Sequence, residues 1–343
     1  MKGSRAGDAR ATMNGDSASS SIIRNILHLT DFSSCSDVAL QWAMGIAKAN
    51  EARLSVVHVV VPDALIYLTP ASPTITLDFQ EQWARKEMQR IKTRLVDLRH
   101  DTIVMRGTNV WSAVEPKLKQ LGSELIVLGT HGRTGLTKRL MGSVAEEIFR
   151  SSAVPVLTVG PKVANGRGKD GKFHQVLLAA DFTAESAEAT GYAVAFARRS
   201  QARLVLLHAR KNSIQSRSEK RSELSVAELM HRLYETIPCA DGLRERPETV
   251  VEYGEPGARI LEVARRKEVD LIVMGIRSAG SVFAATHLDA GTAHKVVAEA
   301  PCPVLTVRAN AGRLAQRQKL SLEPEKCDED VEKRETAPPS LSA

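Results

Sequence analysis

Residues 26–60 read ILHLTDFSSCSDVALQWAMGIAKANEARLSVVHVV, and residues 176–210 read VLLAADFTAESAEATGYAVAFARRSQARLVLLHAR. The two stretches share one pattern at an offset of 150 residues, so that Asp31 matches Asp181 and His58 matches His208. Further along, SELIVLGTHGR returns as VDLIVMGIRSA, and AVPVLTVG returns as PCPVLTVRA. Self-similarity at a nearly constant offset indicates a duplicated structural unit. The chain is therefore predicted to contain two copies of one domain.

Within the first copy, short runs rich in Val, Ile and Leu alternate with helical patterns. The apolar runs are 26–30, 53–61, 102–106, 124–128 and 155–159, and the helical stretches are about 34–50, 78–99, 109–121 and 143–152. Continuous apolar strands that alternate with helices predict a parallel sheet covered on both faces. Each copy is thus predicted to be a doubly wound, five-stranded α/β domain with its ligand site at the carboxyl ends of the strands.

Composition shifts along the chain set the expected domain boundaries. The Gly- and Lys-rich stretch GPKVANGRGKDGK lies between the two copies, and both ends of the chain are polar. The expected organisation is a disordered tail (1–21), a first domain (22–162), a linker (163–172), a second domain (173–309) and a second disordered tail (310–343).

The bulk composition disfavours several classes of protein. Of the 343 residues, 43% are hydrophobic and 25% are charged, which is typical of a soluble globular protein. Aromatic residues make up only 4%, and we find no recognition motif, so the net charge of +7 does not indicate nucleic-acid binding. The four cysteines form no CxxC pair, and no run is apolar enough for a secretory signal or a membrane span. A cytoplasmic protein without its own metal site is expected.

The stretch GTHGRTGLTKRLMGSV, residues 129–144, follows the fourth apolar run and precedes a helical pattern. Gly129 and Gly132 would allow main-chain N–H groups to approach an anion, since no Cβ stands in the way. Gly142 and Ser143 stand at the start of the next helix, where free N–H groups favour phosphate. The alternative from the residues alone is a basic connection in which Ser143 is merely the N-cap.

The spacing within this stretch is that of a known motif. Gly129, two residues, Gly132, nine residues and then Gly142-Ser143 follow the pattern G-x2-G-x9-G-[S/T]. In this pattern, and in TDFS, VVHVV and PVLTV, the chain resembles the ATP-binding branch of the universal stress protein (UspA-like) family over about residues 22–162 and 173–309.

The resemblance implies a fold and a pairing of the repeats. The implied fold is Rossmann-like, of the adenine nucleotide alpha hydrolase type, with strand order 3-2-1-4-5 in each repeat. Members of the family pair through their last strands, so PVLTV at 155–159 and PVLTV at 303–307 are expected to join the repeats as an intramolecular pseudo-dimer. Further assembly into a homodimer stays open.

The resemblance also implies a binding site in the first repeat. Asp31 would bind the ligand near the ribose, and Val59 would meet adenine through its main chain. The implied binding residues are Thr30, Asp31, Val59, Gly129, Gly132, Arg133, Gly142, Ser143 and Val144. The implied ligand is ATP, with ADP and AMP as alternatives, and Mg²⁺ or Mn²⁺ would be held through the phosphates.

The second repeat departs from this pattern after its fourth apolar run. Gly275 is present, but Ser278 stands in place of the second glycine, and the Gly-Ser step has no counterpart at the same spacing. One nucleotide site is therefore expected, in the first repeat, with the second repeat acting as a built-in dimer partner.

Several functions remain compatible with these features. The leading hypothesis is a stress-response protein that binds ATP and changes its conformation or partner affinity. The alternatives are slow ATP hydrolysis, and a scaffold protein with a vestigial nucleotide pocket. ATP pyrophosphatase activity is disfavoured because TDFSSCSD lacks the SGGxDS-like loop of those enzymes, and no catalytic residues are predicted. His58 and His208 are interpreted as strand-end histidines satisfied by their neighbours, and Trp42, Trp83 and Trp111 as packing residues.

Overall fold

The computed structural model describes residues 23–62, 73–130, 141–163, 168–210, 224–237, 242–276 and 290–309. Both predicted tails lie outside these ranges. In the first repeat strands and helices alternate throughout. The elements are β1 (Asn25–Leu29), α1 (Ser34–Asn50), β2 (Arg53–Val60), α2 (Pro73–Arg94), β3 (His100–Arg106), α3 (Val110–Leu121), β4 (Leu125–Gly129), α4 (Ser143–Ser151) and β5 (Val156–Val159).

The second repeat has the same order of elements. They are β6 (Gln175–Ala179), α5 (Ala184–Ser200), β7 (Arg203–Arg210), α6 (Val226–Glu235), β8 (Glu248–Tyr253), α7 (Pro256–Arg266), β9 (Leu271–Gly275), α8 (Ala290–Glu299) and β10 (Val304–Val307). The predicted α/β alternation is therefore confirmed. None of the described helices is long and apolar enough to cross a bilayer.

The second helix was predicted with the wrong boundaries. It was expected at about 78–99, whereas α2 spans Pro73–Arg94. Proline is well accommodated in the first turn of a helix because the N–H it lacks has no partner there. At the other end, Leu95 N–H donates to Lys92 O and Leu98 N–H to Leu95 O, which turns the chain toward β3. Apolar periodicity continues through this turn because Leu95 is buried, so the sequence pattern overruns the helix.

The ten strands of the described residues form one sheet, in the order β3-β2-β1-β4-β5-β10-β9-β6-β7-β8. The predicted order 3-2-1-4-5 is confirmed in each repeat, and neighbours within a repeat are parallel. The repeats meet where β5 and β10 pair antiparallel, as PVLTV predicted. Thr158 Oγ1 donates to Val304 O at 3.1 Å, and Thr306 Oγ1 donates to Val156 O at 3.2 Å, so the hydroxyls strengthen this junction symmetrically.

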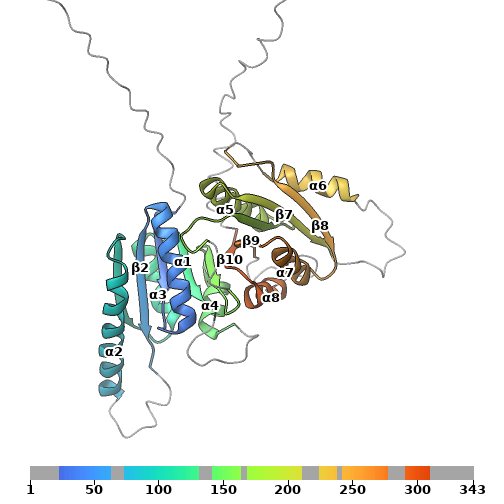
Figure 1. The fold of residues 1–343 in the computed structure, drawn as a ribbon. Helices are drawn as coiled ribbons and strands as arrows, with labels where there is room; N and C mark the ends of the chain where they lie inside the picture. Colours follow the sequence, from blue (N-terminus) through green and yellow to red (C-terminus); the bar gives the residue numbers. More distant parts are fainter. Residues whose placement is uncertain are drawn as a thin grey trace, which may run out of the picture.

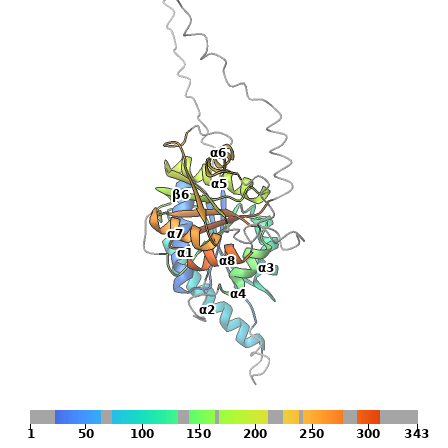
Figure 2. The same cartoon turned by 90° about the vertical axis from the view of Figure 1, so that its right-hand side faces the viewer.

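The helices cover the sheet in two layers. One core lies between the sheet and α1, α2, α5 and α6, and the other between the sheet and α3, α4, α7 and α8. Alternate residues of each strand enter opposite cores, as Ile26 and Leu27 do in β1. In both views of the molecule α2 and α6 lie at opposite ends, and β5 and β10 meet near the middle in Figure 1 (Figures 1 and 2).

The described part of the predicted linker packs against α1. A Cβ on Gly45 would overlap the carbonyl oxygen of Lys169 and approach Gly171 N to 2.7 Å. Beside this contact, the buried Trp42 ring stacks on Phe173 with centroids 6.1 Å apart, and Phe173 meets Phe196 of α5 edge-on at 5.4 Å. The packing role predicted for Trp42 is confirmed, and the connection between the repeats contributes to the core.

Candidate functional site

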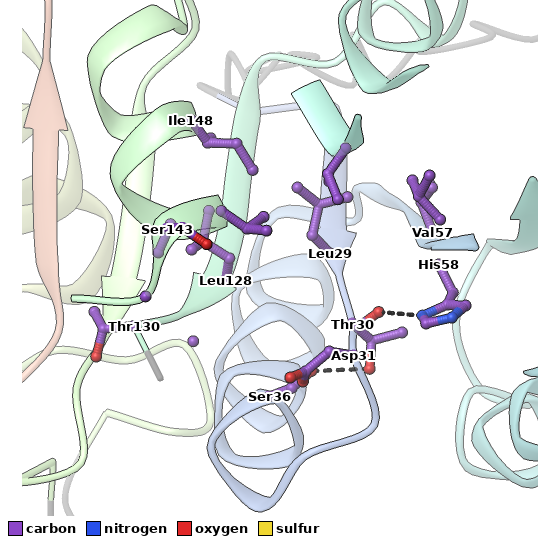
Figure 3. A pocket seen from close by; sticks show the side chains of 16 residues that line it. Leu29, Thr30, Asp31, Ser36, Val57, His58, Leu128, Thr130, Ser143 and Ile148 are labelled. Carbon is purple, nitrogen blue, oxygen red and sulfur yellow. Dashed lines mark hydrogen bonds between the residues drawn. The ribbon is translucent and has the colours of Figure 1, made fainter. Parts of the chain in front are cut away.

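The carboxyl ends of β1, β2 and β4 border a cavity of about 240 Å³ in the first repeat (Figure 3). This is the edge of a doubly wound sheet at which ligands bind, beside the point where the strand order reverses. Predicted site residues gather there. Those lining the cavity are Thr30, Asp31, Val59, Gly129, Gly142, Ser143 and Val144. The other two, Gly132 and Arg133, lie outside the described residues.

The loop after β1 holds Asp31 through a set of short hydrogen bonds. Ser33 N–H donates to Asp31 Oδ1 at 3.0 Å, and the Ser33 hydroxyl caps α1 by accepting from Ser36 N–H. Thr30 Oγ1 accepts from Ser36 Oγ at 2.8 Å and from Phe32 N–H at 3.0 Å. These bonds support Phe32 in the left-handed region, at φ 63°, where a non-glycine residue costs about 1–3 kcal/mol. The Asp31 carboxylate is thereby oriented beside the cavity.

His58 lines the cavity from β2. Its Nδ1 lies 2.7 Å from the carbonyl oxygen of Thr30, which can only accept, so Nδ1 carries a proton and donates it. The second repeat repeats this contact between His208 Nδ1 and Ala180 O at 2.8 Å. The interpretation of both histidines as satisfied strand-end residues is confirmed. The Phe32 ring packs at a tilt against His58, with ring centroids 4.5 Å apart, and the partly exposed Trp83 meets Phe32 edge-on.

Helix α4 presents its N-terminus to the cavity. Its N-cap is Gly142, with φ −62° and ψ 149°, which has no side chain to accept from the first turn. Gly142 N–H itself donates to Thr130 O at 2.7 Å, which ties the helix start to the end of β4. Among the described residues, nothing accepts from the N–H groups of Ser143 or Val144. The alternative in which Ser143 is the N-cap is wrong, because Ser143 is the first helical residue.

The other helices with described N-caps differ in this respect. Each has a side-chain acceptor at its N-cap, and the residues are Ser33, Asn109, Thr183, Ser225 and Glu255. Unsatisfied N–H groups at a helix start carry the positive end of the helix dipole and favour an anion. Within the part of the chain that the structure describes, helix α4 thus combines a start that lacks a side-chain cap with a cavity in front of it.

Gly129 has a packing role that sequence reasoning missed. A Cβ there would lie 3.0 Å from the main-chain carbon and from Sγ of Cys35, at the start of α1. The matching Gly275 is tighter, since its Cβ would lie 2.5 Å from Glu185 C and Ser186 N at the start of α5. Both glycines allow a helix to approach a strand end closely. The presence of Gly129 is therefore not by itself a sign of a ligand. The features that point to a ligand site are the start of α4 and Asp31.

Apolar side chains form much of the remaining cavity wall, and sequence reasoning missed them too. Figure 3 shows Leu29, Val57, Leu128 and Ile148 around the space bordered by Asp31 and Ser143 (Figure 3). In the sequence all four read simply as core residues, although Leu29 and Leu128 lie at the ends of their strands. Such a wall suits a flat apolar ring joined to an anionic group. No cluster of three His, Cys, Asp or Glu side chains among the described residues could hold a metal ion.

Both halves of the chain match one family model. The model is that of the universal stress protein family, and it matches residues 23–160 and 172–308. The chain belongs to the universal stress protein family. A universal stress protein of Mycolicibacterium smegmatis is 28% identical over 306 residues, which cover 82% of this chain and 96% of the relative. One of Thermus aquaticus is 34% identical over 138 residues, covering 40% of this chain and 99% of its own length.

A solved structure supports the fold of this universal stress protein. The crystal structure of a universal stress protein from Archaeoglobus fulgidus matches with a TM-score of 0.61 at 23% identity, covering 83% of this chain and 98% of its own. The predicted membership of the family, as a tandem of two domains, is confirmed. Similarity at this level shows the family and the fold, and the ligand depends on the residues of the site itself.

The second repeat of this universal stress protein keeps only part of the site. Thr183 N–H donates to Asp181 Oδ1 at 3.2 Å, and Phe182 has φ 62°, so the loop after β6 mirrors the Asp31 loop. Ala180 stands where the first repeat has Thr30, however, and contributes no hydroxyl. Ser278 and most of the stretch in which the glycine pattern was predicted to be lost lie outside the described residues, so that prediction stays untested.

Proposed function

We propose that the first repeat binds an adenine nucleotide, with ATP as the leading ligand. The observation that carries the proposal is the uncapped start of α4 facing the cavity of about 240 Å³. Phosphate oxygens accept well from the N–H groups of Ser143 and Val144, and the negative charge is favoured by the helix dipole. Gly142 allows close approach, and the Ser143 hydroxyl offers a further donor. Gly132 and Arg133 are proposed as additional phosphate ligands.

The opposite side of the cavity suits a nucleoside. The Asp31 carboxylate, held by Ser33 N–H, would accept hydrogen bonds from the ribose hydroxyls. The apolar wall accommodates a purine ring, with the main chain of Val59 as the proposed recognition element for adenine. Mg²⁺ or Mn²⁺ is proposed to be held through the phosphates. The cellular role proposed is stress-linked regulation, in which nucleotide binding alters conformation or partner affinity.

Asp31→Asn is expected to weaken ATP binding about tenfold, because a neutral amide replaces a charged acceptor for the ribose hydroxyls. The amide oxygen can still accept from Ser33 N–H, so the loop is retained. Isothermal titration calorimetry with ATP, ADP and AMP, with and without Mg²⁺, measures the effect. Asp181→Asn is the matched control in the second repeat and should leave binding unchanged.

The same titration contains the outcome that contradicts the proposal. If the wild-type chain binds none of the three nucleotides, the proposal is wrong and the scaffold role is favoured. If only Asp181→Asn loses binding, the nucleotide site lies in the second repeat. Phosphate release followed over hours separates a binding protein from a slow ATP hydrolase. Steady release at a rate that Asp31→Asn lowers would favour hydrolysis.

A further inference from the structure

The end of α4 remote from the cavity is contacted by the other repeat. Arg308 follows β10 directly, and its Nη2 donates to the carbonyl oxygen of Phe149 at 3.1 Å. Phe149 lies in the last turn of α4, where carbonyl groups have no partner within the helix. The neighbouring carbonyl oxygen of Ile148 accepts a hydrogen bond from Ser152 N–H. Arg308 therefore supplies a charged donor to a carbonyl that the helix itself leaves without one.

The antiparallel junction explains why Arg308 reaches this point. Thr306 pairs with Val156, so two further residues bring Arg308 opposite Val154, in the turn that leads out of α4. The side chain is half-buried between the repeats, and burial lowers the pKa of Arg308 while the nearby Glu185 carboxylate raises it. A guanidinium stays protonated in such surroundings. A full positive charge thus lies at the negative end of the α4 dipole.

This contact is not repeated on the other side of the junction. The residue that matches Arg308 in the first repeat is Gly160, and the residue that matches Phe149 is Val297 of α8. A Cβ on Gly160 would lie 3.3 Å from Val297 O, so the two positions are neighbours there as well, but glycine has no side chain to donate. The cap is therefore one-sided. The capped helix is α4, whose N-terminus faces the candidate site.

We propose that Arg308 is a positioning residue for nucleotide binding in the first repeat. Helix α4 has only nine residues, and a helix of that length is not stable by itself, so contacts at its ends contribute to its order and direction. By holding the last turn, Arg308 keeps the N–H groups of Ser143 and Val144 directed into the cavity. The second repeat then acts as more than a dimer partner, because it orients the phosphate end of a site that it does not line. The inference rests on the proposed function.

Arg308→Met tests the inference in the full-length chain, with Arg308→Lys as the conservative variant. We expect Arg308→Met to raise the dissociation constant for ATP by about three- to tenfold, since the loss affects the helix end that meets the phosphates. The constant for adenosine should change less than about twofold, because adenosine carries no phosphate. Arg308→Lys should recover most of the affinity for ATP. The matched control is Lys162→Met, which removes a cation paired with Glu299 at the end of α8 and should leave both constants unchanged.

A second measurement does not require a ligand. Hydrogen exchange of the α4 amides in the nucleotide-free chain should be faster in Arg308→Met than in wild type or Lys162→Met. Unchanged exchange in α4, or an equal loss of affinity for ATP and adenosine, overturns the inference. A wild-type chain that binds ATP while Arg308→Met binds it equally well overturns the inference alone. A wild-type chain that binds no adenine nucleotide overturns the proposed function, and the inference with it.

Discussion

Gly45→Val is expected to destabilise the protein by about 3 kcal/mol, because the valine side chain cannot fit between α1 and the segment before β6. A Cβ at Gly45 would already overlap Lys169 O, and both neighbours are main-chain groups that cannot rotate away. Gly171, at φ 79°, packs against Gly45 from the other side and tolerates no side chain either. Urea unfolding should show a lower midpoint, and Trp42 fluorescence should shift to longer wavelength as its contact with Phe173 opens.

The duplication provides a matched control for this substitution. Ala195 occupies the equivalent position in α5 and is partly exposed. Ala195→Val should cost only about 0.5 kcal/mol, which is the difference in helix propensity. If Gly45→Val and Ala195→Val have the same midpoint, the close contact between α1 and the connecting segment does not contribute to stability.

The wild-type protein is expected to lose stability at acidic pH because of His28, and His28→Leu is expected to abolish that loss. His28 is fully buried in β1, where burial lowers its pKa to about 4, although the hydrogen bond of Nδ1 with Val127 O acts in the opposite direction. His28 takes up a proton near pH 6.5 in the unfolded chain but only near pH 4 in the folded chain. The free energy of unfolding is therefore at its full value above pH 6.5 and falls as the pH drops below 6.5. The total loss is about 3 kcal/mol, at 1.36 kcal/mol for each pKa unit.

Urea midpoints between pH 4 and pH 8 test this expectation. The second repeat carries Leu178 at the matching position, also fully buried, so leucine fits this place in the fold. His28→Leu should match wild type to within about 1 kcal/mol at pH 8 and exceed it by about 2 kcal/mol at pH 5. His231→Leu, which removes an exposed histidine, is the control and should keep the acid sensitivity. Parallel pH profiles for wild type and His28→Leu would contradict the assignment.

Much of the fold could be predicted because the apolar pattern is strong and occurs twice. Four helices of the first repeat were located, and the strand order followed from the family resemblance. The boundaries of α2 were wrong because Leu95 continues an apolar period into a turn. The candidate site was predicted in part. Asp31, Val59, Ser143 and their neighbours line one cavity, but no periodicity distinguishes a core leucine from one that ends at a cavity, as Leu128 does.

The sequence alone determined the duplication, the alternation of strands and helices, and the segments that meet at the strand ends. These properties follow from local periodicity and from repetition, which need no knowledge of distant contacts. Tertiary structure decided what depends on approach between distant segments. Gly129 is explained by its contact with Cys35, the start of α4 by the absence of a side-chain cap, and the end of α4 by Arg308 from the other repeat. The contacts of Gly129 and Arg308 are approaches of a few ångströms between residues far apart in the chain, and sequence spacing carries no record of such distances.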